Sequence, residues 1–226
     1  MAGPVELAER LTESGALQNL SPPVQTALFL GAMTLIPAAL VTLTSFTRIV
    51  IVLGFVRRAV TTQEIPPNSV ITGLSLFLTL FIMGPVWDEI NTDSITPYLD
   101  KKISGPEAIR HGTDALRKFM LRQTRRQDLA LFIHLSGIEP PEEASGTPFR
   151  VIVPAFVISE LKTAFVMGFL IYMPFLLVDL VVSSVLTAMG MVMMPPVLIS
   201  APFKVLLFVL ADGWHLVARA LSLSFS

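Results

Sequence analysis

The feature that most constrains this sequence is an apolar stretch that runs almost unbroken over residues 151–210. A helix that crosses a bilayer needs only about 20 such residues, at a rise of about 1.5 Å each, so this stretch must contain a break. Pro174 removes a helical hydrogen bond and predicts a kink. Gly190 is a stronger stop, because a methionine-rich turn and two prolines follow it. We therefore predict a long kinked helix, a turn at 190–196 and a last helix from Pro196.

The first part of the chain contains two more apolar segments of spanning length. Residues 25–56 have Arg48 as their one charged residue, and residues 66–86 carry no charge. A polar connection with two arginines and two prolines joins them, so we expect a helical hairpin over 26–86. The chain is 53% hydrophobic and only 15% charged, whereas roughly a quarter of residues are charged in soluble domains. Lipid or neighbouring subunits must therefore cover much of its apolar surface.

Charges of both signs return in residues 87–150. Apolar residues at helical spacing predict a helix from Pro106 to Leu135, and prolines and glycines predict a loop from Gly137 to Pro148. This segment is expected to be a small helical domain in water.

The predicted fold class is therefore an all-α membrane protein with two long hydrophobic hairpins around a small soluble domain. The expected division is an N-terminal amphipathic segment at 1–25, a first hairpin at 26–86, the soluble domain at 87–150 and a second hairpin at 151–226. Residues 1–25 lack the pattern of a secretory signal peptide. Arg57 and Arg58 predict a cytoplasmic first connection, which places the soluble domain in the periplasm.

Six ionisable residues lie in the apolar segments: Arg48, Glu160, Lys162, Asp179, Lys204 and Asp212. Charges at bilayer depth are costly and are candidates for function, and the alternative is ion pairs between helices or subunits. Glu160 and Lys162 are two positions apart, so they face different sides of a helix and need different partners.

A cluster of methionines occupies the turn between the last two predicted helices, at Met191, Met193 and Met194. Methionine is unbranched and soft, so several copies can close a pore and reshape around a passing chain. Gap-filling at a helix turn is the alternative explanation.

No enzyme pattern has support in the sequence, and we predict a chain without catalytic residues or cofactors. Ser159 and Lys162 spell S-x-x-K, but its partner motifs are missing. The three histidines are scattered, no metal-binding spacing occurs, and there are no cysteines. A net charge of −1 gives no indication of a nucleic-acid partner.

Several motifs in order along the chain resemble the FliP family. They are Thr44-Ser45-Phe46-Thr47-Arg48-Ile49-Val50-Ile51-Val52-Leu53-Gly54, Ile65-Pro66-Pro67-Asn68, Gln123-Thr124-Arg125 with Asp128-Leu129, Ser159-Glu160-Leu161-Lys162-Thr163, Pro174-Phe175-Leu176-Leu177-Val178-Asp179-Leu180-Val181-Val182, Pro202-Phe203-Lys204 and Asp212-Gly213-Trp214. The resemblance covers the chain from about residue 26 to its end.

The resemblance implies a pore-forming subunit of the flagellar type III export gate, in the bacterial inner membrane at the flagellar basal body. It implies a ring of five copies that joins FliQ and FliR in a helical assembly, with FlhB beside it and FlhA below. Unfolded flagellar subunits are expected to pass through its centre. It also implies that hydrophobic helices are largely buried against other subunits.

By the same resemblance, a methionine gasket corresponds to Met191, Val192 and Met193, with Met194 next to it. Val192 replaces a methionine that the family often has, and its β-branched side chain is stiffer. Two alternatives remain: the sister export-gate subunit of virulence systems, the SctR family, and a proton-coupled secondary transporter that uses Glu160 or Asp179. The transporter predicts inverted repeats, which the sequence does not display.

Overall fold

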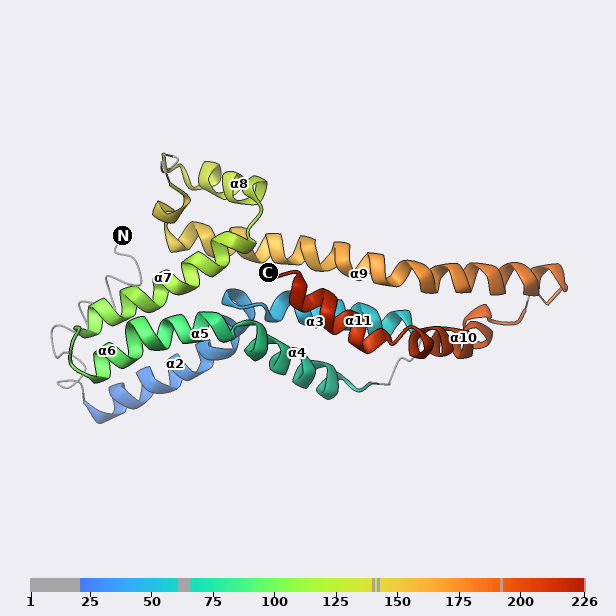
Figure 1. The fold of residues 1–226 in the computed structure, drawn as a ribbon, viewed down its shortest axis with the longest axis horizontal. Helices are drawn as coiled ribbons and strands as arrows, with labels where there is room; N and C mark the ends of the chain where they lie inside the picture. The colour runs from blue at the N-terminus through green and yellow to red at the C-terminus, as the bar shows by residue number, and fades with distance from the viewer. Residues whose placement is uncertain (1–20, 61–65, 140, 142, 192, 226) are drawn as a thin grey trace. The chain divides into compact units, whose positions relative to one another are not determined.

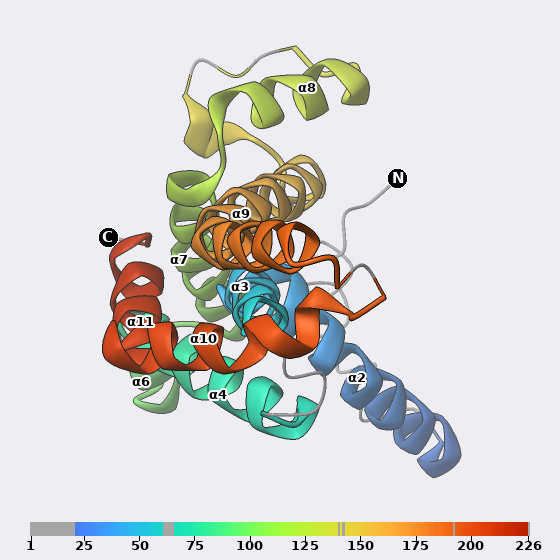
Figure 2. The ribbon, with the colours of Figure 1, turned by 90° about the vertical axis from the view of Figure 1, so that its right-hand side faces the viewer.

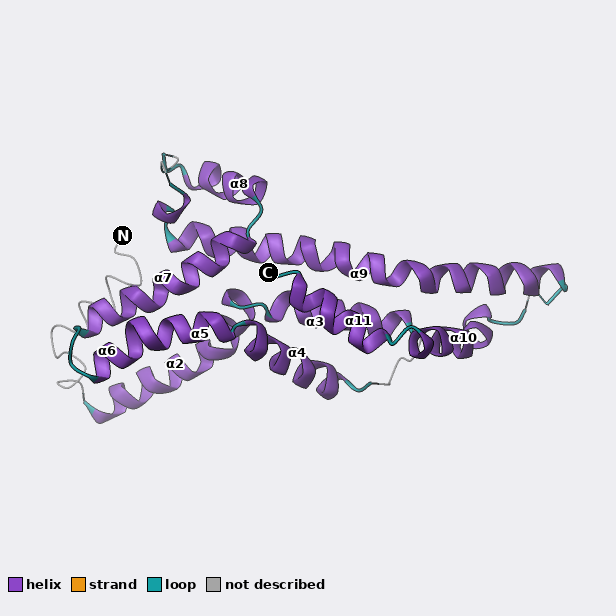
Figure 3. Ribbon diagram, viewed as in Figure 1, coloured by secondary structure: helices purple, strands orange, loops and turns teal. Residues whose placement is uncertain are grey.

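The computed structural model describes residues 21–60, 66–139, 141, 143–191 and 193–225. These residues form helices and loops with no strand among them (Figures 1 and 3), which confirms the predicted all-α fold class. The helices are α2 (Pro22–Leu43), α3 (Phe46–Ala59), α4 (Asn68–Ile82), α5 (Gly84–Ile90), α6 (Thr96–Leu99), α7 (Gly105–Gln123), α8 (Arg126–Ser136), α9 (Phe149–Ala188), α10 (Pro196–Leu210) and α11 (Gly213–Leu223). A π-helical turn, η1 (Asn91–Ile95), joins α5 to α6, and a 3₁₀ turn, η2 (Ala144–Gly146), precedes α9.

The chain divides into two compact units that alternate along the sequence. Among the described residues, the first consists of residues 21–44 and 83–157, and the second of residues 45–82 and 158–225. Most of the predicted amphipathic segment at 1–25 lies outside the described residues. Helix α9 contributes its beginning to the first unit and its remainder to the second.

In the first unit, local sequence signals define where α7 begins. The Ser104 hydroxyl accepts a hydrogen bond from the Glu107 N–H at 3.4 Å, and the Glu107 carboxylate accepts one from the Ser104 N–H at 2.8 Å. This reciprocal capping box satisfies N–H groups that a helix start leaves unpaired. Farther along α7, Phe119 packs edge-on against Phe156 at a centroid distance of 5.9 Å.

In the second unit, α3 lies beside α9 in both views (Figures 1 and 2). Its residues Ile49, Val52, Leu53 and Val56 recur at helical spacing and are at most 1% exposed. This stripe packs in one core with residues of α4, α9 and α11: Ile71, Ala164, Phe175, Val217 and Leu221. The helical spacing of these four residues places them along one face of α3.

Four predicted continuous helices are interrupted. The helix predicted from Pro106 to Leu135 consists of α7 and α8, because Thr124 between them is extended. Helix α2 ends at Leu43, and Thr44 is extended; α4 ends at Ile82, before the Gly84-Pro85 start of α5. The predicted last helix consists of α10 and α11, which differ in direction by 62°. Single breaks of this kind leave the apolar pattern intact, so hydropathy does not reveal them. In contrast, α9 continues through Pro174 as one helix.

Helix α9 is long and apolar enough to cross a membrane, and up to four spans result if each bent helix pair counts as one. Many of its large side chains are exposed in the isolated chain, including Phe169, Leu170, Leu177, Leu180 and Val181. A helix that is apolar on all sides requires lipid or protein around it. The two hairpins remain a prediction.

Candidate functional site

The first of two ion pairs that join helices of the second unit connects α3 to α9. Arg48 lies in the first turn of α3 and is 2% exposed, and Glu160 of α9 is 0% exposed. The Arg48 Nε–H donates to Glu160 Oε2 at 2.9 Å, and its second terminal nitrogen donates to Oε1. Both carboxylate oxygens are therefore engaged by one guanidinium fork, the strong geometry for this pair of groups.

Residues near the end of the chain complete the surroundings of Arg48. Its remaining terminal nitrogen donates to the Ser224 carbonyl at 2.8 Å and to the Ser224 hydroxyl at 2.9 Å. The Phe225 ring covers the guanidinium, with 3.8 Å between Cζ and the ring centroid. Arg48 thus connects three helices, because Ser224 directly follows α11.

The second ion pair joins α9 to α10. Lys204 of α10 is 0% exposed, and its Nζ donates to Asp179 Oδ2 at 2.5 Å. Ser200 lies one turn earlier on α10 and donates its hydroxyl to Asp179 Oδ1 at 2.5 Å. The i, i+4 spacing of Ser200 and Lys204 places both on one helix face.

The structure does not bring the other two predicted charges into this interior. Lys162 is exposed, whereas Glu160 two residues earlier is buried. The Asp212 carboxylate is 78% exposed, 3.9 Å from His215 Nδ1. Their assignment to contacts between subunits stays a prediction.

The methionine turn lies between α9 and α10. Gly190 adopts a positive φ of 77°, the left-handed conformation that favours glycine after a helix. Met193 is 100% exposed, and Met191 and Met194 are also exposed; Val192 lies outside the described residues. The exposed methionines have no core to fill in the isolated chain.

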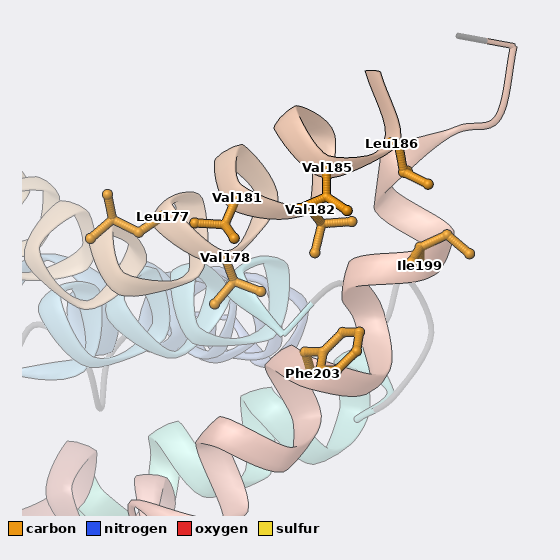
Figure 4. Close-up of a pocket in the computed structure, with 8 residues that line it drawn as sticks. All are labelled: Leu177, Val178, Val181, Val182, Val185, Leu186, Ile199 and Phe203. Carbon is orange, nitrogen blue, oxygen red and sulfur yellow. The ribbon is translucent and has the colours of Figure 1, made fainter. Parts of the chain in front are cut away.

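An apolar groove of about 580 Å³ lies next to this turn, between the end of α9 and the start of α10. Figure 4 shows side chains of both helices, among them Val182, Val185 and Phe203, along its walls. Its lining contains no charged residue, so it offers no acid, base or nucleophile.

No described part of the chain groups three or more histidine, aspartate or glutamate residues for a metal ion. Ser159 is buried at 0% exposure and Lys162 is exposed. Ser200, Ser224 and Phe225 are partners of these charges that the sequence did not predict. A helical spacing of four from Lys204 is a signal for Ser200, but no local pattern indicates Ser224 or Phe225.

An all-α chain with an apolar helix of spanning length and paired charges between its helices belongs to the class of membrane proteins. The sequence model of the FliP family matches residues 29–221, and this chain belongs to that family. That finding confirms the resemblance recognised in the motifs. The family is not known to be enzymatic, which confirms the prediction of a chain that is not an enzyme.

Three relatives illustrate the similarity, and each is named flagellar biosynthetic protein FliP. The protein of Bacillus subtilis (strain 168) is 51% identical over 92% of this chain and 94% of its own length. That of Pectobacterium carotovorum subsp. carotovorum is 50% identical over 92% of this chain and 81% of its own. The protein of Aquifex aeolicus (strain VF5) is 47% identical over 92% and 87%.

Proposed function

We propose that this chain is a pore-forming subunit of the flagellar type III protein export gate, through which unfolded flagellar subunits leave the cell. Membership of the FliP family, whose relatives carry a flagellar name, supports an export-apparatus subunit. The observation that carries the pore is the methionine turn at the end of α9, where Met193 is fully exposed. Flexible thioether side chains suit a seal that must yield to many different sequences.

Assembly with other chains accounts for the apolar surface. Exposed apolar patches of more than a few hundred Å² mark interaction sites. Helices α9 and α10 expose large apolar side chains over most of their lengths. We infer several copies of this chain, five by family resemblance, together with FliQ and FliR. FlhB and FlhA are the expected neighbours in the inner membrane at the basal body, and lipid covers what the subunits leave.

Within this proposal the two ion pairs hold helices of one subunit together, and Lys162 and Asp212 are available to neighbours. The soluble domain at 87–150 is assigned to the periplasm, and the gasket to Met191, Val192, Met193 and Met194. The names of the relatives favour a flagellar system over a virulence system. Both carboxylates proposed for a proton carrier, Glu160 and Asp179, already accept hydrogen bonds from cations, which disfavours the transporter.

Native mass spectrometry of the detergent-solubilised complex tests the proposal. The chain is tagged, co-expressed with FliQ and FliR, and compared with the same chain expressed alone. We expect a discrete hetero-oligomer with several copies of this chain in the co-expressed sample. A monomer or dimer in both samples would contradict the export-gate proposal and favour the transporter.

A further inference from the structure

A narrow groove in the second unit combines apolar walls with one cation. Its volume is about 190 Å³, and it is lined by residues of α3, the connection before α4, α10 and the start of α11. Val56 and Val60 line it from α3, and Val205 and Val209 from α10, each pair at the i, i+4 spacing that places two side chains on one helix face. Phe208 is 8% exposed, whereas Val205 and Val209 are 40% and 67% exposed, so the α10 side of the groove faces outward.

The cation of this groove is Arg57, whose guanidinium donates a hydrogen bond to Asn68 Oδ1. Asn68 is the first residue of α4, so this bond holds the guanidinium at the polar connection between α3 and α4. A guanidinium has five N–H groups, and the bond to Asn68 uses one of them. Among the described residues, no carboxylate forms an ion pair with Arg57 or with its exposed neighbour Arg58. The described part of the chain therefore leaves two adjacent cations without an anion.

Trp214 indicates that the groove lies near a membrane surface. It lines the groove together with Arg57, is 43% exposed and packs edge-on against Phe208, with 5.2 Å between the ring centroids. Tryptophan is enriched where a membrane meets water, because its ring is apolar and its N–H reaches polar groups. The two arginines predict that this connection faces the cytoplasm, where the membrane surface carries anionic lipids.

We propose that this groove binds an anionic phospholipid, with its phosphate held by Arg57 and Arg58 and an acyl chain along the exposed side of α10. Guanidinium groups bind phosphate through paired N–H bonds, and basic pockets between membrane helices bind anionic headgroups. The volume of about 190 Å³ is below the roughly 300–1,000 Å³ of sites that enclose a small molecule. It suits one end of a molecule that extends along the protein surface. The inference goes beyond the proposed function, because it requires only that the second unit lies in a membrane.

Native mass spectrometry of the delipidated complex with FliQ and FliR measures lipid binding. Phosphatidylglycerol is added to one sample, and phosphatidylcholine with the same acyl chains to another, so that only the headgroup differs. We expect the complex to bind phosphatidylglycerol several-fold more. Arg57→Gln should reduce that binding about fivefold, the effect of one basic residue near an anionic surface. Arg219→Gln on α11 removes an exposed positive charge that does not line the groove, and it should leave lipid binding unchanged.

Two further comparisons separate the phosphate contact from other effects of Arg57. Arg57→Gln also removes the hydrogen bond to Asn68, so Arg58→Gln, at an exposed position, serves if that variant does not assemble. Glu64 lies outside the described residues and is the acid nearest to both arginines in sequence, so the comparison is repeated with Glu64→Gln. The dependence on Arg57 should persist there, and its disappearance would contradict a direct contact with the lipid.

A phosphatidylglycerol with a photoreactive group on its acyl chain locates the site. Peptide mass spectrometry should find the crosslinks on residues 205–209 of α10, and fewer of them in Arg57→Gln. Equal binding of the two lipids by the parent complex, or crosslinks that avoid residues 205–209, would overturn the proposal. Complete displacement of the lipid by inorganic phosphate would also overturn it, because the site would then bind a free anion. Lipid and subunit masses are read separately, so a failure of the lipid site leaves the copy number that tests the export gate unchanged.

Discussion

Gly168 of α9 approaches Phe55 of α3 so closely that a Cβ on the glycine would lie 2.4 Å from Phe55 Cδ2. Phe165, one turn before Gly168 on α9, meets the Phe55 ring edge-on at a centroid distance of 5.6 Å. The absence of a side chain at position 168 is therefore what allows α3 and α9 to pack. A side chain at position 168 would overfill this contact and force α3 and α9 to shift.

We expect Gly168→Ala to lower the free energy of unfolding by about 1–3 kcal/mol, the usual cost of overpacking. The loss is measured as a lower thermal midpoint and a smaller yield of monodisperse complex. Gly112→Ala on α7 is the matched control, because its new Cβ would meet Ser94 Oγ at an ordinary 3.5 Å. Equal thermal midpoints for the two variants would show that the Phe55 side chain moves aside without loss of stability.

The Asp179–Lys204 pair predicts a strong non-additivity. Lys204→Ala removes the cation from a carboxylate whose side chain is 26% exposed, and this should cost up to about 3 kcal/mol. Asp179→Ala likewise strands a lysine that is 1% exposed. The double variant should regain part of the loss, because no buried charge remains. The measurement is the amount of complex in native mass spectrometry, and additive losses would contradict the pairing.

An exposed pair supplies the control for that experiment. Lys118 Nζ lies 2.6 Å from Glu89 Oε1, and the hydrogen bond to Glu89 raises the pKa of Lys118. Both groups remain in contact with water, where ion pairs contribute little to stability. Lys118→Ala should leave the amount of complex unchanged.

Replacing Met191, Met193 and Met194 with glycine should make the closed gate leak small ions. Removing three thioether side chains opens space that backbone alone does not fill. Ion conductance across cells or vesicles that contain the assembled complex is the measurement. Met173→Gly on α9, also an exposed methionine, controls for general loss of methionine. Unchanged conductance in an assembled turn variant would exclude the gasket.

The capping box of α7 predicts a pH dependence. Hydrogen bonds from the Ser104 backbone and hydroxyl lower the pKa of Glu107 from its ordinary 4.5. A carboxyl whose folded pKa is lowered stabilises the fold above pH 4.5 and loses that contribution as the pH falls through the folded pKa. Glu107→Ala should therefore lower the thermal midpoint at pH 7, and its difference from the parent should shrink below pH 4. A difference that stays constant with pH would argue against the capping carboxylate.

Hydropathy correctly predicted the helical fold class because apolar runs of this length have few other solutions, and ordered motifs correctly indicated the FliP family. The pattern did not predict the breaks at Thr44, Met83 and Asp212, because each lies between residues of suitable hydropathy on both sides. The one long helix predicted through Pro174 is confirmed, because α9 runs from Phe149 to Ala188, and the kink at Pro174 stays a prediction.

For the candidate site, too, the sequence indicates the residues and the tertiary structure shows their partners. The sequence by itself determined which ionisable residues lie in apolar surroundings, since Arg48, Glu160, Asp179 and Lys204 stand out against their neighbours. Only the tertiary structure decided that Arg48 donates hydrogen bonds to Glu160 and Ser224 and that Lys204 donates one to Asp179. Those partners are 112, 176 and 25 positions apart, and helix periodicity relates residues only within a few turns. Which charges form pairs depends on how α3, α9, α10 and α11 pack. That packing depends on side-chain volumes, for example on the absence of a side chain at Gly168 where Phe55 approaches.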